Sequence, residues 1–494
     1  MRPALQIVLF SVLLFVAGLA LFTRANRFPF HRHPDEPVKV AQLQTGNWNF
    51  NHPMLLLSTA RLALAASGTD LRDPQRVVEV GRWVSAGFAA ATAALMAAAL
   101  WLAAGRFAGI AVGLLILSNH QLFELSHYLK EDTALAFGLA AWLLGLALYR
   151  RWPGRATAAF VGAGAALALS GKYIGALAPL ISLWLLASPR TTPRARRYLP
   201  FLAAFLATVA LVNAPMLGNK EHWESSFNRE VTLAVNGQGG MTRSVPHTIY
   251  FRAFRDNLHL VLWIFIALAF WRAWQRRREL GPEELALFLV PLLLMALLSF
   301  SPKANDRYFL PATVLFLGAA ALGISAIPRK AALPALLAAA VAFQVIGHPG
   351  RDLRSYWLAF QSDDRSALTA WLNVRPPGEV IVQDRRTLLP SAAKPAFLAW
   401  QEPLTPRVLP QALEKYPDLQ SLRAEGATLA ALCQDDYERF DLKKLRPQKG
   451  AEETARRTGE LYRAIRENRQ PLWQRPRGLV IYLHPGLVVY SMPE

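Results

Sequence analysis

Residues 4–22 read ALQIVLFSVLLFVAGLALF, an apolar run without a charged residue. A helix rises 1.5 Å per residue, so a run of this length matches the roughly 30 Å hydrocarbon core of a bilayer. The run has few preceding residues and no small-residue cleavage pattern before Arg24, which predicts a retained helix rather than a signal peptide. Similar runs recur as far as residue 346 and then stop. The sequence therefore predicts a polytopic membrane protein.

Composition and charge support that class. The chain has 494 residues, of which 53% are hydrophobic, more than a soluble core of this length needs. The net charge of +20 comes from short arginine clusters between apolar runs, not from one face of a soluble domain, so no nucleic-acid partner is expected. The single cysteine, Cys433, excludes an intramolecular disulfide framework and a cysteine-based metal cluster.

Arginine positions predict the orientation of the spans. With the N-terminus in the cytoplasm, alternation places clusters such as Arg150–Arg151 and Arg276–Arg278 in cytoplasmic loops, as the positive-inside rule requires. We expect a multi-pass protein of the inner (plasma) membrane with an extracytoplasmic C-terminal domain. Eleven spans are predicted, near residues 4–23, 81–104, 107–119, 132–149, 156–170, 173–189, 198–216, 258–273, 284–300, 308–326 and 330–346.

The expected fold class is an α-helical polytopic membrane protein with a small α/β C-terminal domain. Residues 1–349 would form the membrane domain, with extracytoplasmic loops 24–80 and 217–257, and residues 350–494 the soluble domain. In that tail, Glu379–Val382 and Leu479–Leu483 are short β-like runs separated by charged helical stretches. The long, glycine-rich loop 217–257 is either a lid or acceptor binder, or a plain connector.

Acidic residues occur at two corners on the predicted outer side. Asp35 and Glu36 follow the first span, and Glu131 and Asp132 open the fourth. Each corner alone is explained by an acid at a helix N-terminus, worth about 0.3–1 kcal/mol. Two corners at the same interface suggest a site. Between them, residues 55–66 predict an interfacial or re-entrant helix, with His52 at its entry near the headgroups.

Three cations stand where topology and helix dipoles disfavour them. Lys172, Lys303 and Arg307 lie on the predicted translocated side and at helix N-termini. Such a placement indicates an anionic partner, either the carboxylates of the acidic corners or an external phosphate. Snorkelling of the long side chains to the interface is the alternative.

These motifs resemble the membrane glycosyltransferases of the GT-C class, specifically the protein O-mannosyltransferase and lipid A aminoarabinose transferase group (glycosyltransferase families 39 and 83). The resemblance covers the membrane region. Its parts are Pro34-Asp35-Glu36, His52-Pro53 with Leu55, Lys130-Glu131-Asp132 with Leu135, Gly171-Lys172-Tyr173, and Arg307-Tyr308 with Pro311. The tail segment from Asp364 to Leu372 also fits bacterial members. The chain departs from the group at His52-Pro53-Met54, where a basic residue and two prolines are common.

The resemblance implies an inverting transfer of a sugar, hexosyl or pentosyl, from a polyprenyl monophosphate to a glycan, lipid or protein hydroxyl. Asp35 would be the general base, a role that contributes about 10²–10⁴-fold, with Glu36 and Asp132 beside it as further catalytic acids. The donor phosphate would be held by Lys172, Arg307, Tyr308 and His52. No cofactor is certain. Asp132 would orient the acceptor, or Asp35, Glu36, Asp132 and His52 would bind Mg²⁺, Mn²⁺ or Zn²⁺.

Two other classes of protein compete with an enzyme. A transporter or flippase of lipid-linked intermediates would also need many spans and external cations, but it should show ionisable residues in mid-span and repeated halves. A membrane scaffold that displays the tail domain would leave both acidic corners unexplained. The sugar and its acceptor cannot be identified from the residues.

Overall fold

The computed structural model describes residues 3–186, 195–236, 246–303, 305–389, 404–443, 445, 450 and 452–492. The chain divides into two compact units. The helical unit comprises Met1–Phe30, Asp35–Gly237 and Val245–Arg354, and the smaller unit comprises His31–Pro34, Gln238–Ser244 and Ser355–Glu494.

Every apolar run predicted as a span coincides with helix over most of its described residues, and residues 187–189 of the run 173–189 lie outside the described residues. The α-helices of the helical unit are α1 Pro3–Phe22, α2 Glu36–Thr45, α3 Leu55–Ser67, α4 Pro74–Ala104, α5 Arg106–Leu117, α6 His120–Ser126, α7 Glu131–Arg151, α8 Arg155–Gly171, α9 Leu177–Leu186, α10 Ala195–Val212, α11 Ala214–Leu217, α12 Lys220–Asn236, α13 Pro246–Gln275, α14 Pro282–Ser299, α15 Leu310–Ser325 and α16 Leu333–Ile346. Short 3₁₀ helices at Tyr173–Ala176 and Asp306–Phe309 lead into α9 and α15. The apolar stretch after His52 is helical as predicted, as α3.

By length and composition, fewer than eleven of the described helices can each cross a membrane alone. Among the described residues, six helices are long and apolar enough to cross a membrane, namely α1, α4, α7, α13, α14 and α15 with its preceding turn. A seventh arises if α5 and α6, bent by 58°, form one broken span. The protein is a membrane protein, but the predicted count of eleven is not confirmed, because several of the remaining helices are too short to cross hydrocarbon alone.

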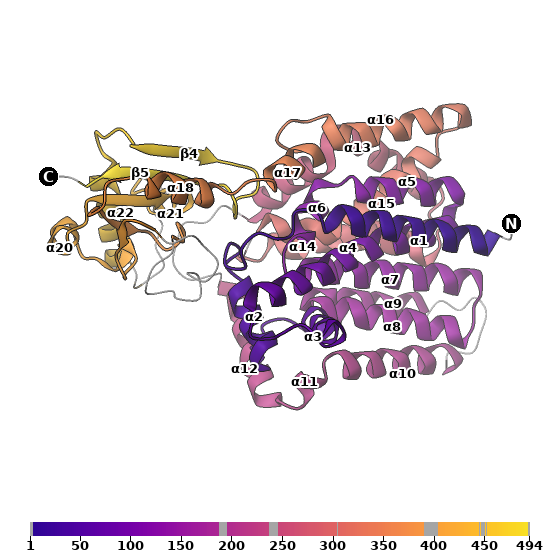
Figure 1. The fold of residues 1–494 in the computed structure, drawn as a ribbon. Coiled ribbons are helices and arrows are strands. Elements are labelled where there is room, and N and C mark those ends of the chain that lie inside the picture. The colour runs from indigo at the N-terminus through magenta and orange to yellow at the C-terminus, as the bar shows by residue number, and fades with distance from the viewer. Residues whose placement is uncertain are drawn as a thin grey trace. The chain divides into compact units, whose positions relative to one another are not determined.

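The central helices pack closely through glycines. Helices α1, α4, α7, α8 and α10 run side by side (Figure 1). A Cβ atom at Gly138 of α7 would lie 2.4 Å from the Ala168 backbone of α8, and one at Gly164 of α8 would lie 2.6 Å from the Trp142 backbone of α7. Small residues let helix backbones approach where no hydrophobic driving force exists in lipid. In contrast, α1 presents large apolar side chains outward, such as Leu13, 63% exposed.

The smaller unit is an α/β domain, as predicted. Its strands are β1 Val380–Gln383, β2 Arg407–Val408, β3 Leu429–Cys433, β4 Trp473–Arg477 and β5 Pro485–Ser491, in the order β2-β1-β3-β5-β4. Strand β1 pairs in parallel with β2 and β3, and β5 pairs antiparallel with β3 and β4. Helix α18 (Asp364–Asn373) and helix α22 (Glu452–Arg466) each contribute to one of its two cores.

One of the two predicted strands is wrong. The run Glu379–Val382 corresponds to β1, but Leu479–Leu483 forms the turn between β4 and β5. The backbone N–H of Gly478 donates to the His484 carbonyl at 3.0 Å, which closes the hairpin. Val480 and Leu483 are buried all the same. A short apolar run signals burial and does not by itself distinguish a strand from a buried turn.

Close packing of α7 against α8 can be tested with one methyl group. We expect Gly164→Ala to lower the free energy of unfolding by about 1–3 kcal/mol, because the new Cβ meets backbone that cannot yield. Gly87→Ala on α4 is the control, since nothing lies within 4 Å of its Cβ position. The measurement is the thermal midpoint of the full chain in detergent. Equal midpoints for the two variants would contradict this account of the packing.

Candidate active site

Glu36 and Arg82 form a fully buried ion pair. The Arg82 Nε donates to Glu36 Oε1 at 2.9 Å and its Nη2 to Oε2 at 2.6 Å, and both side chains are 0% exposed. The Leu129 backbone N–H also donates to Glu36, at 2.9 Å. The remaining guanidinium hydrogens reach backbone carbonyls of residues 26–29. This bidentate pair joins the start of α2 to α4 and to the turn before α7.

Asp35, the residue before Glu36, is placed differently. It is the N-cap residue of α2 but makes no side-chain capping hydrogen bond, so simple helix capping does not account for it. Its side chain is 43% exposed. Lys130 Nζ donates to Asp35 Oδ2, and Arg307 Nη1 lies 3.7 Å from the same oxygen. The carboxylate thus lies between two cations and stays accessible.

The acids of the second corner are also paired with cations from distant elements. Lys172 Nζ, in the turn after α8, donates to Asp132 Oδ1 at 2.7 Å. Lys39 on α2 donates to Glu131 Oε1. Burial alone would lower the pKa of Lys172, but attraction to Asp132 and Tyr308 together with the hydrogen bond to Asp132 raises it overall. Lys172 therefore keeps its charge.

Tyr308 lies between two of the cations predicted from the sequence. Lys172 Nζ is 4.3 Å from the centre of its ring, and the Arg307 guanidinium carbon is 5.5 Å from it. Cations at these distances over an aromatic ring are attracted by its quadrupole. Through Arg307, Tyr308 connects the Asp132–Lys172 pair with Asp35.

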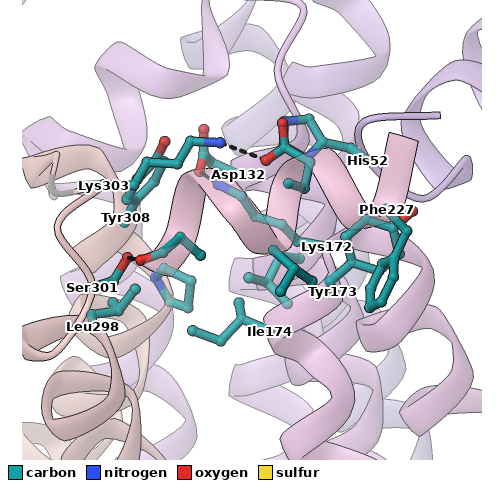
Figure 2. A pocket seen from close by; sticks show the side chains of 15 residues that line it. His52, Asp132, Lys172, Tyr173, Ile174, Phe227, Leu298, Ser301, Lys303 and Tyr308 are labelled. Atoms are coloured by element: carbon teal, nitrogen blue, oxygen red, sulfur yellow. Dashed lines mark hydrogen bonds and ion pairs between the residues drawn. The ribbon is translucent and has the colours of Figure 1, made fainter. Parts of the chain in front are cut away.

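Beside this cluster lies a pocket of about 210 Å³. His52, Asp132, Lys172 and Tyr308 contribute to its lining, together with apolar side chains that include Ile174, Phe227, Val231 and Leu298. Figure 2 shows His52 and Asp132 in its upper part and Ile174 and Leu298 in its lower part. A polar end and an apolar wall therefore face the same space.

Helix α12 supplies one wall of the pocket. It lies in the predicted loop 217–257 and contributes Phe227, Glu230 and Val231. Glu230 pairs with Lys303 at 2.5 Å, so this third misplaced cation has a carboxylate partner that the sequence reasoning missed. Trp223 Nε1 donates to the Tyr173 hydroxyl at 3.1 Å, which ties α12 to the turn carrying Lys172. Residues 237–245 of the loop lie outside the described residues.

His52 differs in its protonation state from the other basic residues of the site. Burial lowers the pKa of His52 to about 3, and the nearby Glu131 carboxylate offsets only part of that effect. The imidazole is therefore neutral at pH 7. Burial, followed by repulsion from Arg307 and Lys39, lowers the pKa of Lys130 to about 8. His52 can donate a hydrogen bond to an anion, but it does not bring a positive charge.

The sequence predicted both partners of the Asp132–Lys172 and Asp35–Arg307 pairs, but only one partner of the other pairs. Lys39, Lys130 and Arg82 had no assigned role, although two of them flank the acidic motifs closely in sequence. Around the pocket, five cations (Lys39, Lys130, Lys172, Lys303 and Arg307) face four carboxylates (Asp35, Glu131, Asp132 and Glu230). The described cluster therefore carries an excess positive charge, which suits a phosphate ligand.

Two of the expected metal ligands, Asp35 and Asp132, already have cationic partners, and His52 was expected beside them. Asp35 and Asp132 each bind a lysine ammonium group. In the part of the chain that the structure describes, no group of three or more His, Cys, Asp or Glu side chains is arranged to hold a metal ion. The arrangement does not fit a preformed divalent-cation site, because the carboxylates that would bind the ion already have cationic partners.

Sequence comparison alone identifies no relative: no protein-family model and no curated protein matches the chain. Solved structures do match. ArnT from Cupriavidus metallidurans, in a crystal structure bound to undecaprenyl phosphate, aligns with 99% of this chain and 98% of its own at 13% identity and a TM-score of 0.52. The apo form of ArnT gives the same values.

A second protein has a similar fold. The apo oligosaccharyltransferase of Archaeoglobus fulgidus aligns with 86% of this chain and 70% of its own, at 12% identity and a TM-score of 0.51. At such low identity the likeness concerns the fold. The chain has the GT-C fold of these membrane glycosyltransferases, as the sequence motifs implied.

Proposed function

We propose that the protein is an inverting glycosyltransferase that moves a sugar from a polyprenyl-monophosphate donor to a hydroxyl group of an envelope glycan, lipid or protein. One observation carries the proposal. Asp35, Asp132, Lys172, Arg307 and Tyr308, from separate stretches of sequence, meet beside a pocket with one apolar wall. The transfer would occur on the extracytoplasmic side of the inner (plasma) membrane.

The cations of the cluster are the proposed phosphate site. Lys172 and Arg307 would each exchange a carboxylate contact for the donor phosphate, and Tyr308 between them would donate its hydroxyl hydrogen. His52, neutral at pH 7, would add a hydrogen bond. The apolar side chains of Phe227, Val231 and Leu298 suit the first isoprene units of the lipid. The undecaprenyl phosphate bound to the ArnT structure agrees with a donor of this class.

The reaction is a single displacement. Asp35 accepts the proton of the acceptor hydroxyl while that oxygen attacks the anomeric carbon. The bond from the anomeric carbon to the phosphate oxygen breaks, and its electron pair stays on the phosphate. Lys172 and Arg307 stabilise the negative charge that develops there. Because the nucleophile enters opposite the leaving group, the configuration at the anomeric carbon inverts.

Asp132 and Glu36 have supporting roles in this proposal. Asp132 holds Lys172 at 2.7 Å and would orient the acceptor once the phosphate engages the lysine. Arg82 donates a hydrogen bond to each oxygen of the Glu36 carboxylate, which is fully buried. Although Glu36 was predicted to be a catalytic acid, we propose that it fixes the position of Asp35 instead.

The transfer assay separates an enzyme from a transporter or flippase. Purified protein in liposomes should release polyprenyl phosphate and a glycosylated acceptor, whereas a transporter would bind or move the donor without cleaving it. Mass spectrometry of envelope glycans from cells with and without the gene would then identify the sugar and the acceptor class.

For Asp35→Asn we expect kcat to fall about 10²–10⁴-fold, because the amide cannot accept the acceptor proton. The donor KM should change little. Steady-state transfer from a polyprenyl-phosphate sugar measures both constants. Asp256→Asn is the matched control, since it removes a carboxylate that pairs with Arg255 and Arg351 away from the pocket. Full activity of the Asp35 variant would remove this residue as the base.

For Arg307→Gln we expect the donor KM to rise and kcat/KM to fall by about 10–100-fold, the range of a lost charged hydrogen bond. Arg307→Lys should be intermediate, because it keeps the charge but loses the planar fork. Arg329→Gln, in the segment after α15, serves as the control. An unchanged KM in the Gln variant would mean that Arg307 does not contact the donor.

For Glu36→Gln we expect a loss of stability and, because Asp35 is no longer held in place, a lower kcat. Removing one partner of a buried ion pair costs about 3–5 kcal/mol, whereas Glu224→Gln, at an exposed pair with Lys220, should be nearly neutral. The thermal midpoint measures stability, and kcat is measured at a temperature below that midpoint. A hundredfold fall in kcat with an unchanged midpoint would show that Glu36 acts in catalysis.

A further inference from the structure

A second cavity, of about 220 Å³, lies where the ends of α4, α13 and α15 meet the start of α14. Its polar lining includes Arg272, Arg276, Glu284 and Ser325, and its apolar lining includes Phe288 and Leu322. We call it the basic cavity. It shares no lining residue with the pocket of the candidate active site.

The basic cavity lies at the other end of the helices from the active-site pocket. Helix α15 has Pro311 in the lining of that pocket and Leu322 in the lining of the basic cavity. Its 16 residues span about 24 Å. Trp271 and Trp274 on the last turns of α13 are 60% and 65% exposed. Exposed tryptophans at helix ends mark the level of a membrane interface, so the cavity opens near lipid headgroups.

The charge in the basic cavity is positive. Its one acidic lining residue, Glu284, accepts hydrogen bonds from the Gly281 backbone N–H at 2.9 Å and from Arg150 at 3.1 Å, and Arg150 also pairs with Glu283 at 2.5 Å. Arg276 pairs with Glu279 at 3.4 Å, and both side chains are exposed. Among the described residues, no carboxylate forms an ion pair with Arg272. Two guanidinium groups and one carboxylate thus line the cavity, which leaves its lining with an excess of one positive charge.

We propose that the basic cavity binds the phosphate of an anionic membrane lipid. Arginine is suited to this ligand because its planar fork matches two phosphate oxygens. Phe288 and Leu322 would contact the glycerol and the first acyl carbons. Basic pockets between helices at a membrane surface bind acidic headgroups in this way. The site is separate from the proposed transfer reaction and does not depend on it.

Two alternatives to a bound lipid lead to different experimental outcomes. Arg272 and Arg276 could complement the partial negative charge where α4, α13 and α15 end, which requires no ligand. A soluble phosphate compound could also supply the same anion. The lipid is favoured because the cavity combines cations with apolar walls beside the interfacial tryptophans.

The test measures lipid binding to the full chain by native mass spectrometry, with phosphatidylglycerol and phosphatidylcholine as probes. We expect phosphatidylglycerol to be retained preferentially, and the double variant Arg272→Gln, Arg276→Gln to bind it about tenfold more weakly. The matched control is Arg277→Gln with Arg278→Gln, which removes the same charge from neighbouring residues outside the lining. The control should change affinity less than about twofold.

A second measurement does not depend on the variants folding. Phosphatidylglycerol should raise the thermal midpoint of the unmodified protein more than phosphatidylcholine does, because a ligand of the folded state stabilises it. Equal loss of phosphatidylglycerol binding in both double variants would overturn the proposed lipid site. Equal binding of both lipids by the unmodified protein would also overturn it. Displacement of phosphatidylglycerol by glycerol 3-phosphate at similar concentration would contradict a lipid ligand and indicate a soluble phosphate compound instead.

Discussion

A charge removed from water is stable only beside a partner of opposite sign, and the helical unit meets that requirement by pairing charges across elements. The ion pair of Glu36 with Arg82 is its most buried case, with neither side chain exposed. It fixes where α2 begins relative to α4. Because Asp35 directly precedes Glu36, the same pair determines where Asp35 lies relative to Lys130 and Arg307. The position of Asp35 in the candidate site therefore depends on this contact.

The ion pairs around the pocket are less buried than Glu36–Arg82. Their charged groups are therefore easier for a ligand to reach. Asp35 and Arg307 retain exposed fractions of 43% and 20%, so a ligand can approach them and exchange their contacts. A phosphate would compete with carboxylates for the same cations in a partly desolvated space, where electrostatic interactions are stronger than in water. The proposed reaction uses that competition, since the charge on the phosphate increases as the bond to the sugar breaks.

This chain and ArnT have similar folds although their sequence identity is very low. Thirteen per cent identity to ArnT leaves few common residues, yet the alignment covers nearly all of both chains. Membrane helices require apolar residues but seldom particular ones, so many sequences satisfy the same arrangement. Specific residues are required where backbones touch, as at Gly138 and Gly164, and where charges must be matched.

The sequence by itself determined the membrane class, the helical positions of the apolar runs over their described residues and the residue types of the candidate site, because hydrophobic length and misplaced charges are local properties. It also indicated an α/β tail, but it could not tell a strand at residues 479–483 from a buried turn. Only the tertiary structure decided which charges pair. Arg82 with Glu36, Lys39 with Glu131 and Glu230 with Lys303 join residues 46 to 92 positions apart. Such pairings depend on how helices pack, and spacing along the chain does not encode them.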